Sequence, residues 1–243
     1  MGTFQWSIQV YWLIIGGWLA WDYYRESRDR QLKASQLERL LAESQLQTLQ
    51  TQLQPHFLFN ALNTISAFVE RDPGGARQMI EHLGDLLRLS LAHSTRQETS
   101  LEEELAVLDH FLAIQRVRFE DRLTVVMAIE PETLRATVPG FILQPLVENA
   151  IRHGAAQQRP NRITVSAARA NGSLHLCVID NGPGLPSGWR LSESAGIGLS
   201  NTQQRLAHLY PATHQFNLRE TPDGGVTAEI VLPYREALGV ENS

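Results

Sequence analysis

His56 is a candidate nucleophile, set among large apolar residues in the segment Leu53–Asn63 (LQPHFLFNALN). An imidazole with an ordinary pKa is largely neutral near pH 7, and the neutral ring is nucleophilic. Asn60 follows one helical turn later on the same face of the expected helix, where it can orient the ring. A histidine that only packs on a helix is the simpler interpretation of His56 alone, so its chemistry depends on what lies downstream.

The first of three polar patches downstream, 148–150 (ENA), is suited to hold a cation. Asn149 lies within the apolar segment 141–151, which predicts a helix. A carboxamide oxygen is a ligand that Mg²⁺ accepts, and bound Mg²⁺ commonly bridges to substrate phosphates. Arg152 and His153 follow three and four residues later, so both can reach a phosphate or a ribose from one helix face. An asparagine that caps or joins a hydrogen-bond network is the alternative for Asn149 alone.

The second patch follows an apolar strand. Asp180 ends this strand and precedes Asn-Gly-Pro-Gly at 181–184. A carboxylate in that place can accept a hydrogen bond from a purine amino group, which gives base specificity. Gly182 and Gly184 allow the backbone to approach a ligand closely. A simple Asp-Gly turn without a ligand remains the alternative.

The third patch contains Gly196 and Gly198 and leads into a helix expected from Leu199 to Leu209. The free N–H groups at such a helix start would face the phosphates of a nucleotide. The patch is neither a P-loop, which needs Gly-Lys-Ser/Thr, nor a Rossmann turn, which needs a strand directly before it. Residues 185–195, rich in Ser, Gly and Pro, are typical of a mobile lid.

The elements around these patches predict an α+β domain with helices against one mixed sheet. Ser100 and Glu103 form the sequence pattern of a capping box, which begins a helix that reaches about Phe119. Pro139 is expected to begin the helix that carries Asn149. The expected strands, with a hairpin turn at Asn171-Gly172, are 122–129, 163–170, 174–179, 215–220 and 226–232.

The segments before this domain are predicted to form long helices. Residues 26–54 contain almost no Gly or Pro and predict a two-stranded coiled coil with a stutter, or else a single solvated helix packed on another domain. The helix should continue, bent, through Pro55 and end near 71–75. A second helix from Ala76 to about His93 would complete a hairpin, and two hairpins would pair into a four-helix bundle in a homodimer.

The N-terminal segment 4–24 is apolar and rich in tryptophan, with no charge before Asp22. About eighteen such residues span roughly 27 Å as a helix, close to a bilayer core. Basic residues follow the segment and none precedes it, which places the rest of the chain in the cytoplasm by the positive-inside rule. An amphipathic or buried helix is the alternative.

The length, charge and cysteine content limit the classes of protein to which the chain can belong. The chain has 243 residues, enough for two modest domains or for one domain plus appendages. Its formal net charge of −5 argues against nucleic-acid binding. The single cysteine, Cys177, excludes an internal disulfide and lies in an apolar run that predicts a buried strand position.

In their order, the three patches resemble the N, G1 and G2 boxes of the GHKL (Bergerat-fold) ATPases, a group that includes gyrase, Hsp90, MutL and histidine kinases. The segments 53–60 (LQPHFLFN) and 144–150 (QPLVENA) closely resemble the LytS-type branch of membrane sensor histidine kinases, and the resemblance covers about residues 45–233. It implies that His56 is the phosphoacceptor, Asn149 the Mg²⁺ ligand and Asp180 the adenine reader. It also implies that the lid hinges are Gly182, Gly184, Gly196 and Gly198. Asn201 falls on a polar position that the family commonly shares in its third box.

Two positions depart from the wider superfamily. Many histidine kinases have an acidic residue directly after the phosphorylated histidine, whereas this chain has Phe57. The ATP-hydrolysing relatives have a catalytic glutamate four residues before the Mg²⁺ asparagine, whereas this chain has Pro145. Glu148 is a candidate base, but its direction from the helix is open, so the general base is unassigned.

The resemblance implies a membrane sensor histidine kinase that autophosphorylates on His56 with Mg·ATP and passes the phosphoryl group to an aspartate of a cytoplasmic response regulator. A non-catalytic ATP-binding dimeric scaffold and a gyrase- or Hsp90-like ATPase are the alternatives. Relatives usually carry several membrane spans, so we expect either that the chain is truncated at its start or that it senses through the membrane or a partner. The expected organisation is a single-pass membrane helix (1–24), a coiled coil (25–52), the helical dimerisation hairpin (53–95), the Bergerat-type ATP-binding sandwich (96–235) and a tail (236–243).

Overall fold

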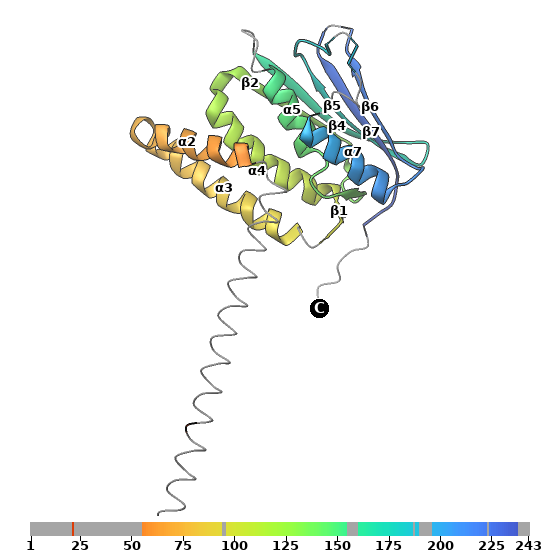
Figure 1. Ribbon diagram of the computed structural model, residues 1–243, viewed down its shortest axis with the longest axis horizontal. Coiled ribbons are helices and arrows are strands. Elements are labelled where there is room, and N and C mark those ends of the chain that lie inside the picture. The colour runs from red at the N-terminus through yellow and green to blue at the C-terminus, as the bar shows by residue number, and fades with distance from the viewer. Residues whose placement is uncertain are drawn as a thin grey trace, which may run out of the picture. The chain divides into compact units, whose positions relative to one another are not determined.

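The computed structural model describes residues 55–93, 96–154, 160–186, 188–189, 196–222 and 224–237, together with Trp21 (Figure 1). The expected membrane helix, apart from Trp21, and the expected coiled coil lie outside the described residues. Within the part of the chain that is described, no helix has both the length and the apolar character needed to cross a membrane.

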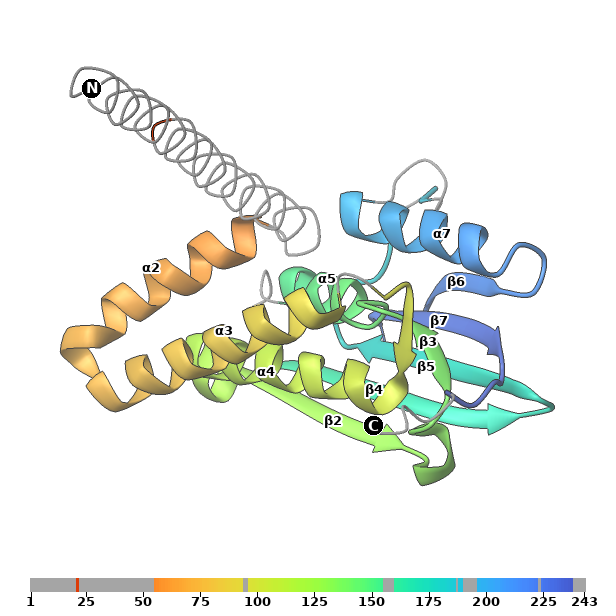
Figure 2. The same ribbon diagram turned by 90° about the horizontal axis from the view of Figure 1, so that it is seen from below.

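Helices α2 (Pro55–Arg71) and α3 (Pro73–His93) form a hairpin, as the sequence predicts (Figure 2). The predicted start of the second helix at Ala76 is three residues late. The reason is a cap, because the N–H of Gly75 donates to Oδ1 of Asp72 at 3.0 Å. Asp72 is thus the N-cap and Pro73 takes the first helical position, where proline loses no hydrogen bond.

The hairpin packs against helix α4 (Leu101–Phe119). Phe57 is 4% exposed and its ring centroid lies 4.9 Å from that of the buried Phe111. Met79 and Leu86 of α3 are fully buried. Burying a side chain of this size stabilises a fold by about 1.5–3 kcal/mol, so the hairpin is held on α4 mainly by apolar contact.

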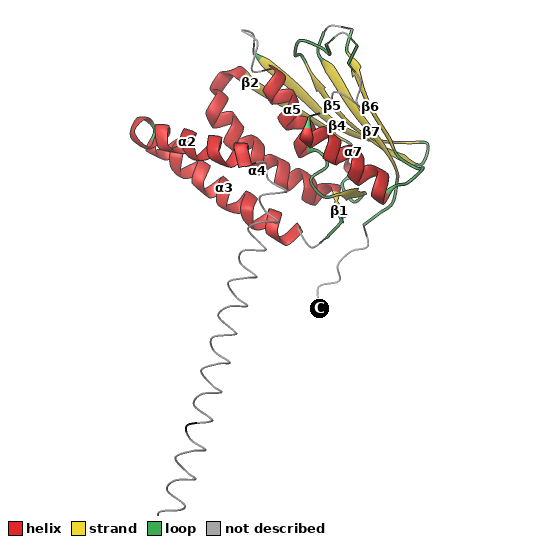
Figure 3. Cartoon of the chain, viewed as in Figure 1, coloured by secondary structure: helices red, strands yellow, loops and turns green. Residues whose placement is uncertain are grey.

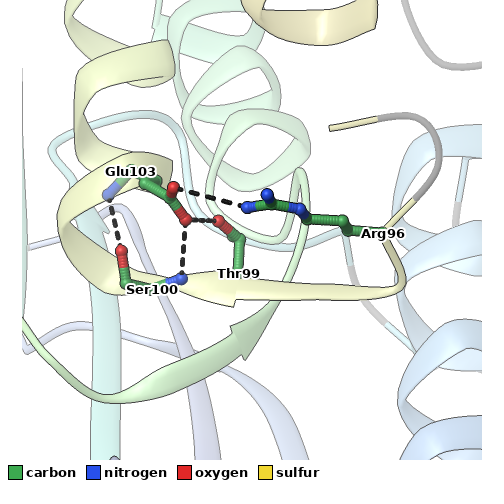
Figure 4. A network of polar contacts seen from close by, with 4 residues as sticks. All are labelled: Arg96, Thr99, Ser100 and Glu103. Carbon is green, nitrogen blue, oxygen red and sulfur yellow. Dashed lines mark hydrogen bonds and ion pairs between the residues drawn. The ribbon is translucent and has the colours of Figure 1, made fainter. Parts of the chain in front are cut away.

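Helix α4 begins with the predicted capping box (Figure 4). The hydroxyl of Ser100 accepts the N–H of Glu103 at 3.2 Å, and the Glu103 carboxylate accepts the N–H of Ser100, also at 3.2 Å. Thr99 donates its hydroxyl to the same carboxylate, and Arg96 lies 3.7 Å from it. This network fixes the point where the chain leaves the hairpin and enters the α+β domain.

A five-stranded mixed sheet forms one layer of that domain (Figure 3). Its strands follow the order β2-β4-β5-β7-β6, and only β2 and β4 are parallel. Their bounds are β2 Leu123–Ile129, β4 Asn161–Ala170, β5 Ser173–Asp180, β6 Gln215–Glu220 and β7 Val226–Pro233. The two predicted hairpins are confirmed, and Asn171 and Gly172 have φ values of 51° and 78°, as a tight two-residue turn requires.

Helices cover one face of the sheet, and no helix among the described residues covers the other, open face (Figure 2). Along β5 the side chains of Leu174, Leu176 and Val178 are buried beneath the helices. Cys177 lies between them in the strand, as predicted, but it is only half-buried. The alternation of a strand turns it to the open face, so the prediction of a buried cysteine is wrong.

The start of the Asn149 helix is also corrected. Pro139 ends strand β3 (Thr137–Pro139), which pairs with β1 (Glu98–Ser100) in a separate two-stranded sheet. Helix α5 begins at Gln144 and runs to Gly154, and Phe141 before it has a left-handed φ of 58°. Pro145, rather than Pro139, is the proline of the first turn. The remaining elements are α7 (Ile197–Leu209) and the short 3₁₀ turns Glu120–Arg122 and Pro131–Thr133.

Candidate nucleotide-binding site

A cavity of about 630 Å³ lies between α5, the end of β5 and the start of α7. The residues that line it are Asn149, Arg152, His153, Asp180, Pro183, Gly184, Leu185, Pro186, Gly188, Trp189, Gly196, Leu199, Leu218 and Val226. Side chains from all three predicted patches therefore meet around one space, although the patches are separated by about thirty and about fifteen residues in the sequence.

Asp180 lies at the end of β5 with 8% of its surface exposed. Its Oδ1 accepts the N–H groups of Gly182 at 2.7 Å and of Val226 at 3.2 Å. Burial raises the pKa of this carboxyl, while those two bonds and the nearby His153 oppose the rise. Since both bonds use Oδ1, Oδ2 is the oxygen that can accept a hydrogen bond from a ligand.

Two glycines make room for Asp180, one at its carboxylate and one at its backbone carbonyl. A Cβ on Gly182 would lie 2.7 Å from Oδ1 of Asp180. A Cβ on Gly225 would lie 2.1 Å from the carbonyl oxygen of Asp180, and Gly225 has a φ of +98°. Sequence reasoning missed Gly225, because the Gly224-Gly225 pair has the ordinary appearance of a hairpin turn.

The end of α5 carries the polar groups of the first patch. Oδ1 of Asn149 accepts a hydrogen bond from Nη2 of Arg152 at 2.8 Å. The same Nη2 lies 3.4 Å from Nε2 of His153. Desolvation lowers the pKa of His153, Arg152 lowers it further and Asp180 opposes them, so the net effect favours the uncharged ring.

Gly154 and Asn161 hold the C-terminus of α5, and sequence reasoning missed both. Nδ2 of Asn161 donates to the carbonyl oxygens of Ala150 at 3.3 Å and Ile151 at 3.4 Å. A Cβ on Gly154 would lie 2.2 Å from the Asn161 side chain. Basic residues followed by glycine are a known signal for a helix end, and Arg152-His153-Gly154 carries that signal.

Helix α7 begins at Ile197, two residues earlier than predicted, with Gly196 at the N-cap position. Gly196 makes no side-chain cap bond, and a Cβ placed on it would lie 3.7 Å from Nη2 of Arg152. The start of α7 and the end of α5 are thus neighbours. Backbone N–H groups at a helix start and a guanidinium together form a suitable environment for phosphate oxygens.

The loop after β5 is anchored at one end by Glu220. Oε1 of Glu220 accepts the N–H of Leu185 at 3.1 Å, and Gly184 beside it has a left-handed φ of +82°. Most of the expected lid, including all of 190–195, lies outside the described residues.

Several predicted residues do not line the cavity. Asn201 is exposed on α7, two residues from the lining Leu199, and residues two apart on a helix point in nearly opposite directions. Gly198 and Gly182 do not line the cavity either, although Gly182 supports Asp180. Glu148 is partly buried, which raises its pKa, and it too is absent from the lining.

His56 and Asn60 belong to α2, and no lining residue in the described part of the chain comes from that helix. The side chain of His56 lies outside the described residues. Asn60 is half-buried, and its backbone carbonyl accepts the hydroxyl of Thr64 at 2.8 Å.

Comparison with known families agrees with this arrangement. The family described as histidine kinase matches residues 44–123. The family described as histidine kinase-, DNA gyrase B-, and HSP90-like ATPase matches residues 138–236, which include the whole cavity wall. The chain therefore belongs to the histidine kinases and carries their GHKL-type ATPase domain, an α+β domain that implies ATP binding.

The curated relatives that the chain matches are sensor kinases and include LytS proteins, which confirms the predicted resemblance to the LytS-type histidine kinases. The chain is 35% identical over 210 residues to sensor histidine kinase BtsS of Escherichia coli K12, covering 85% of this chain and 37% of that protein. It is 30% identical over 208 residues to sensor protein LytS of Enterococcus faecalis V583, covering 82% and 35%. The chain thus spans little more than a third of the length of these relatives.

Among solved structures it is similar to the histidine kinase domain of a blue-light activated histidine kinase from Erythrobacter litoralis. The TM-score is 0.47 at 19% identity, over 83% of this chain and 94% of that one.

Proposed function

We propose that this chain is the catalytic part of a two-component sensor kinase, which transfers the γ-phosphoryl group of ATP to His56 and then to an aspartate of a response regulator. The observation that carries the proposal is the single cavity in which Asp180, the end of α5 and the start of α7 meet. A carboxylate suited to a purine amino group lies in the same space as the cationic and N–H groups suited to phosphates.

Different cavity residues bind different parts of the nucleotide. Oδ2 of Asp180 accepts the adenine amino group, and the N–H groups after Gly196 and the Arg152 guanidinium bind the phosphates. Asn149 supplies an oxygen for Mg²⁺, which neutralises phosphate charge when it is bound. That oxygen accepts from Arg152 at 2.8 Å, so Mg²⁺ held there would lie near the Arg152 guanidinium, which is itself close to Gly196.

The transfer step forms one bond and breaks one. An unprotonated ring nitrogen of His56 attacks the γ-phosphorus in line, the bond from that phosphorus to the bridging oxygen breaks, and ADP leaves with the electron pair. The phosphorylated ring then loses its N–H proton. Glu148 is the candidate acceptor, because burial raises its pKa and thereby its basicity.

The hairpin supports a homodimer. Phe59, Leu62 and Val69 are exposed on α2 at helical spacing, and Ile80 and Leu91 are exposed on α3. A second hairpin would cover this apolar surface in a four-helix bundle. Residues 1–24 would anchor the dimer in the cytoplasmic membrane with the ATP-binding domain inside the cell.

A labelling experiment tests the phosphoacceptor. With ATP radiolabelled in its γ-phosphate, the wild-type chain should become labelled and His56→Gln should not, whereas both should bind ATP with equal affinity. The label should be acid-labile and base-stable, as a phosphohistidine is. Labelled His56→Gln would overturn the assignment.

One observation favours the alternative of a non-catalytic scaffold. Phe57 takes the place where many kinases have an acidic residue, and it is buried against α4. A wild-type chain that binds ATP and never becomes labelled would support the scaffold. Steady release of inorganic phosphate without a phosphoprotein would instead indicate an ATPase.

A further inference from the structure

A buried carboxylate outside the cavity connects α4 to the nucleotide helices. Glu104 is 1% exposed. Its Oε2 accepts the N–H of Phe141 at 2.7 Å and its Oε1 accepts the N–H of Leu143 at 2.9 Å. An acidic group buried to this degree is retained only with such partners, because its desolvation is costly.

The two N–H groups belong to the turn that starts α5. The carbonyl of Leu143 accepts the N–H groups of Leu146 at 3.1 Å and Val147 at 3.0 Å, so Leu143 is the residue at the helix N-cap. Leucine has no side-chain acceptor and is a poor cap. Glu104 of another helix instead accepts the N–H of Leu143 at this N-cap and that of Phe141 two residues before it, and its negative charge suits the positive end of the α5 dipole.

The same turn is held from its other side by α7. Arg205 donates from Nη1 to the carbonyl of Gly140. The charge of Arg205 also acts on Glu104, lowering the pKa of the carboxyl that burial raises. The turn 140–143 is therefore clamped between a carboxylate of α4 and a guanidinium of α7.

Both helices reach the cavity a short distance from the clamp. Asn149 lies six residues beyond Leu143, which is about 9 Å along α5, and Gly196 lies nine residues before Arg205, which is about 13 Å along α7. We propose that Glu104 is a positioning residue for the triphosphate, because it fixes the start of α5, and through Arg205 fixes α7, so that Asn149 and the N–H groups after Gly196 face the same phosphates. This inference rests on the proposed ATP site.

The substitution Glu104→Gln tests the proposal at nearly constant volume. A glutamine has one acceptor oxygen and presents an NH₂ group to the second N–H, so one of the two bonds must be lost. Because a hydrogen bond to a charged group is lost, we expect the Kd for Mg·ATP to rise about tenfold or more. Adenosine, which needs Asp180 but no phosphate contact, should bind within about twofold of wild type.

Two further variants complete the experiment. Glu102→Gln, at an exposed carboxylate two residues away on the same helix, should leave the calorimetric Kd values for Mg·ATP and adenosine unchanged. Arg205→Met removes the other side of the clamp and should weaken Mg·ATP selectively, as Glu104→Gln does. If Glu104→Gln shows no cooperative thermal unfolding, and is therefore not folded, Arg205→Met is the variant that tests the proposal.

The outcomes are separable. Wild type that binds neither ligand contradicts the proposed ATP site itself. If wild type binds both, an unchanged Kd for Mg·ATP in the folded variant overturns the role of Glu104. An equal loss of Mg·ATP and adenosine overturns it too, because a general structural defect would not discriminate between them.

Discussion

The close approach of Gly225 to Asp180 can be tested with a control built into the chain. Gly224 and Gly225 both have a left-handed φ, at +82° and +98°. A Cβ on Gly224 would meet nothing within 4 Å, whereas a Cβ on Gly225 would lie 2.1 Å from the Asp180 carbonyl oxygen and 2.9 Å from its carbon. Alanine therefore adds backbone strain at both positions but a steric overlap at only one.

The expected magnitudes follow from this difference. Gly224→Ala should lower the free energy of unfolding by about 1 kcal/mol, the usual cost of a left-handed alanine. Gly225→Ala should lower the free energy of unfolding by about 1–3 kcal/mol more than Gly224→Ala does, because the overlap forces β5 and the hairpin apart. The shift also moves Asp180, whose Oδ1 accepts the N–H of Val226, so affinity for adenine nucleotides should fall in this variant alone.

Urea unfolding of the two variants, followed by calorimetric titration with ATP, measures both effects. Equal losses of stability would refute the close approach, since they would leave strain as the only cost. Full ATP affinity in a folded Gly225→Ala chain would refute the link to Asp180.

Three other predictions concern single side chains. Ser100→Ala removes the acceptor for the Glu103 N–H and should cost about 1 kcal/mol of unfolding free energy in urea, with Ser100→Thr restoring most of it; an unaltered midpoint would contradict the cap. Asp180→Asn keeps an acceptor for Gly182 and turns an NH₂ group to the ligand, so ATP affinity should fall at least about tenfold by titration while the melting temperature changes little. Burial raises the pKa of Glu104 from 4.5 to about 7, so the native state keeps this proton longer than the unfolded chain does. The free energy of unfolding of wild type, measured relative to that of Glu104→Gln, should therefore fall by about 3 kcal/mol as the pH rises from 4.5 to 7, and it should not change above pH 7. If this difference instead increased with pH, the raised pKa of Glu104 would be contradicted.

Local signals made much of the fold predictable. The capping box at Ser100 and the Asn171-Gly172 turn each depend on residues within four positions of one another, and both are present as predicted. The three patches could also be recognised in the sequence, because the types and order of their residues resemble the N, G1 and G2 boxes, while the role of each residue stays a prediction. Of these, Asn149, Asp180 and Gly196 line one cavity.

Contacts between distant segments explain what was missed. The bonds from Glu104 to Phe141 and from Asp180 to Val226 join residues 37 and 46 positions apart. Nothing near Pro139 indicates that a carboxylate of another helix accepts the N–H groups of the next turn, or that α5 begins only at Gln144. The environment of Gly225 likewise depends on the pairing of β5 with β7, which the local sequence of that turn does not contain.

The position of α4 shows why the hairpin and the nucleotide site must be considered together. Glu104 and Phe111 lie seven residues apart, so two turns, or about 10 Å, separate the contact with the α5 turn from the contact with the hairpin on one side of the same helix. Between side chains of the described residues, polar contacts also join the hairpin to the end and the middle of the α4 segment, and the following two are weak. Arg71 and Glu120 form an exposed ion pair at 3.0 Å, a kind that contributes at most about 1 kcal/mol. Nδ1 of His82 lies 3.2 Å from Nδ1 of His110, a hydrogen bond that needs an N–H on one Nδ1 and a lone pair on the other. The apolar contacts of α3, together with the contact of Phe57 with Phe111, therefore hold the hairpin on α4. Since no cavity residue of the described chain comes from α2, the proposed transfer to His56, the residue next to Phe57, would use the hairpin of a second chain or follow the release of this contact.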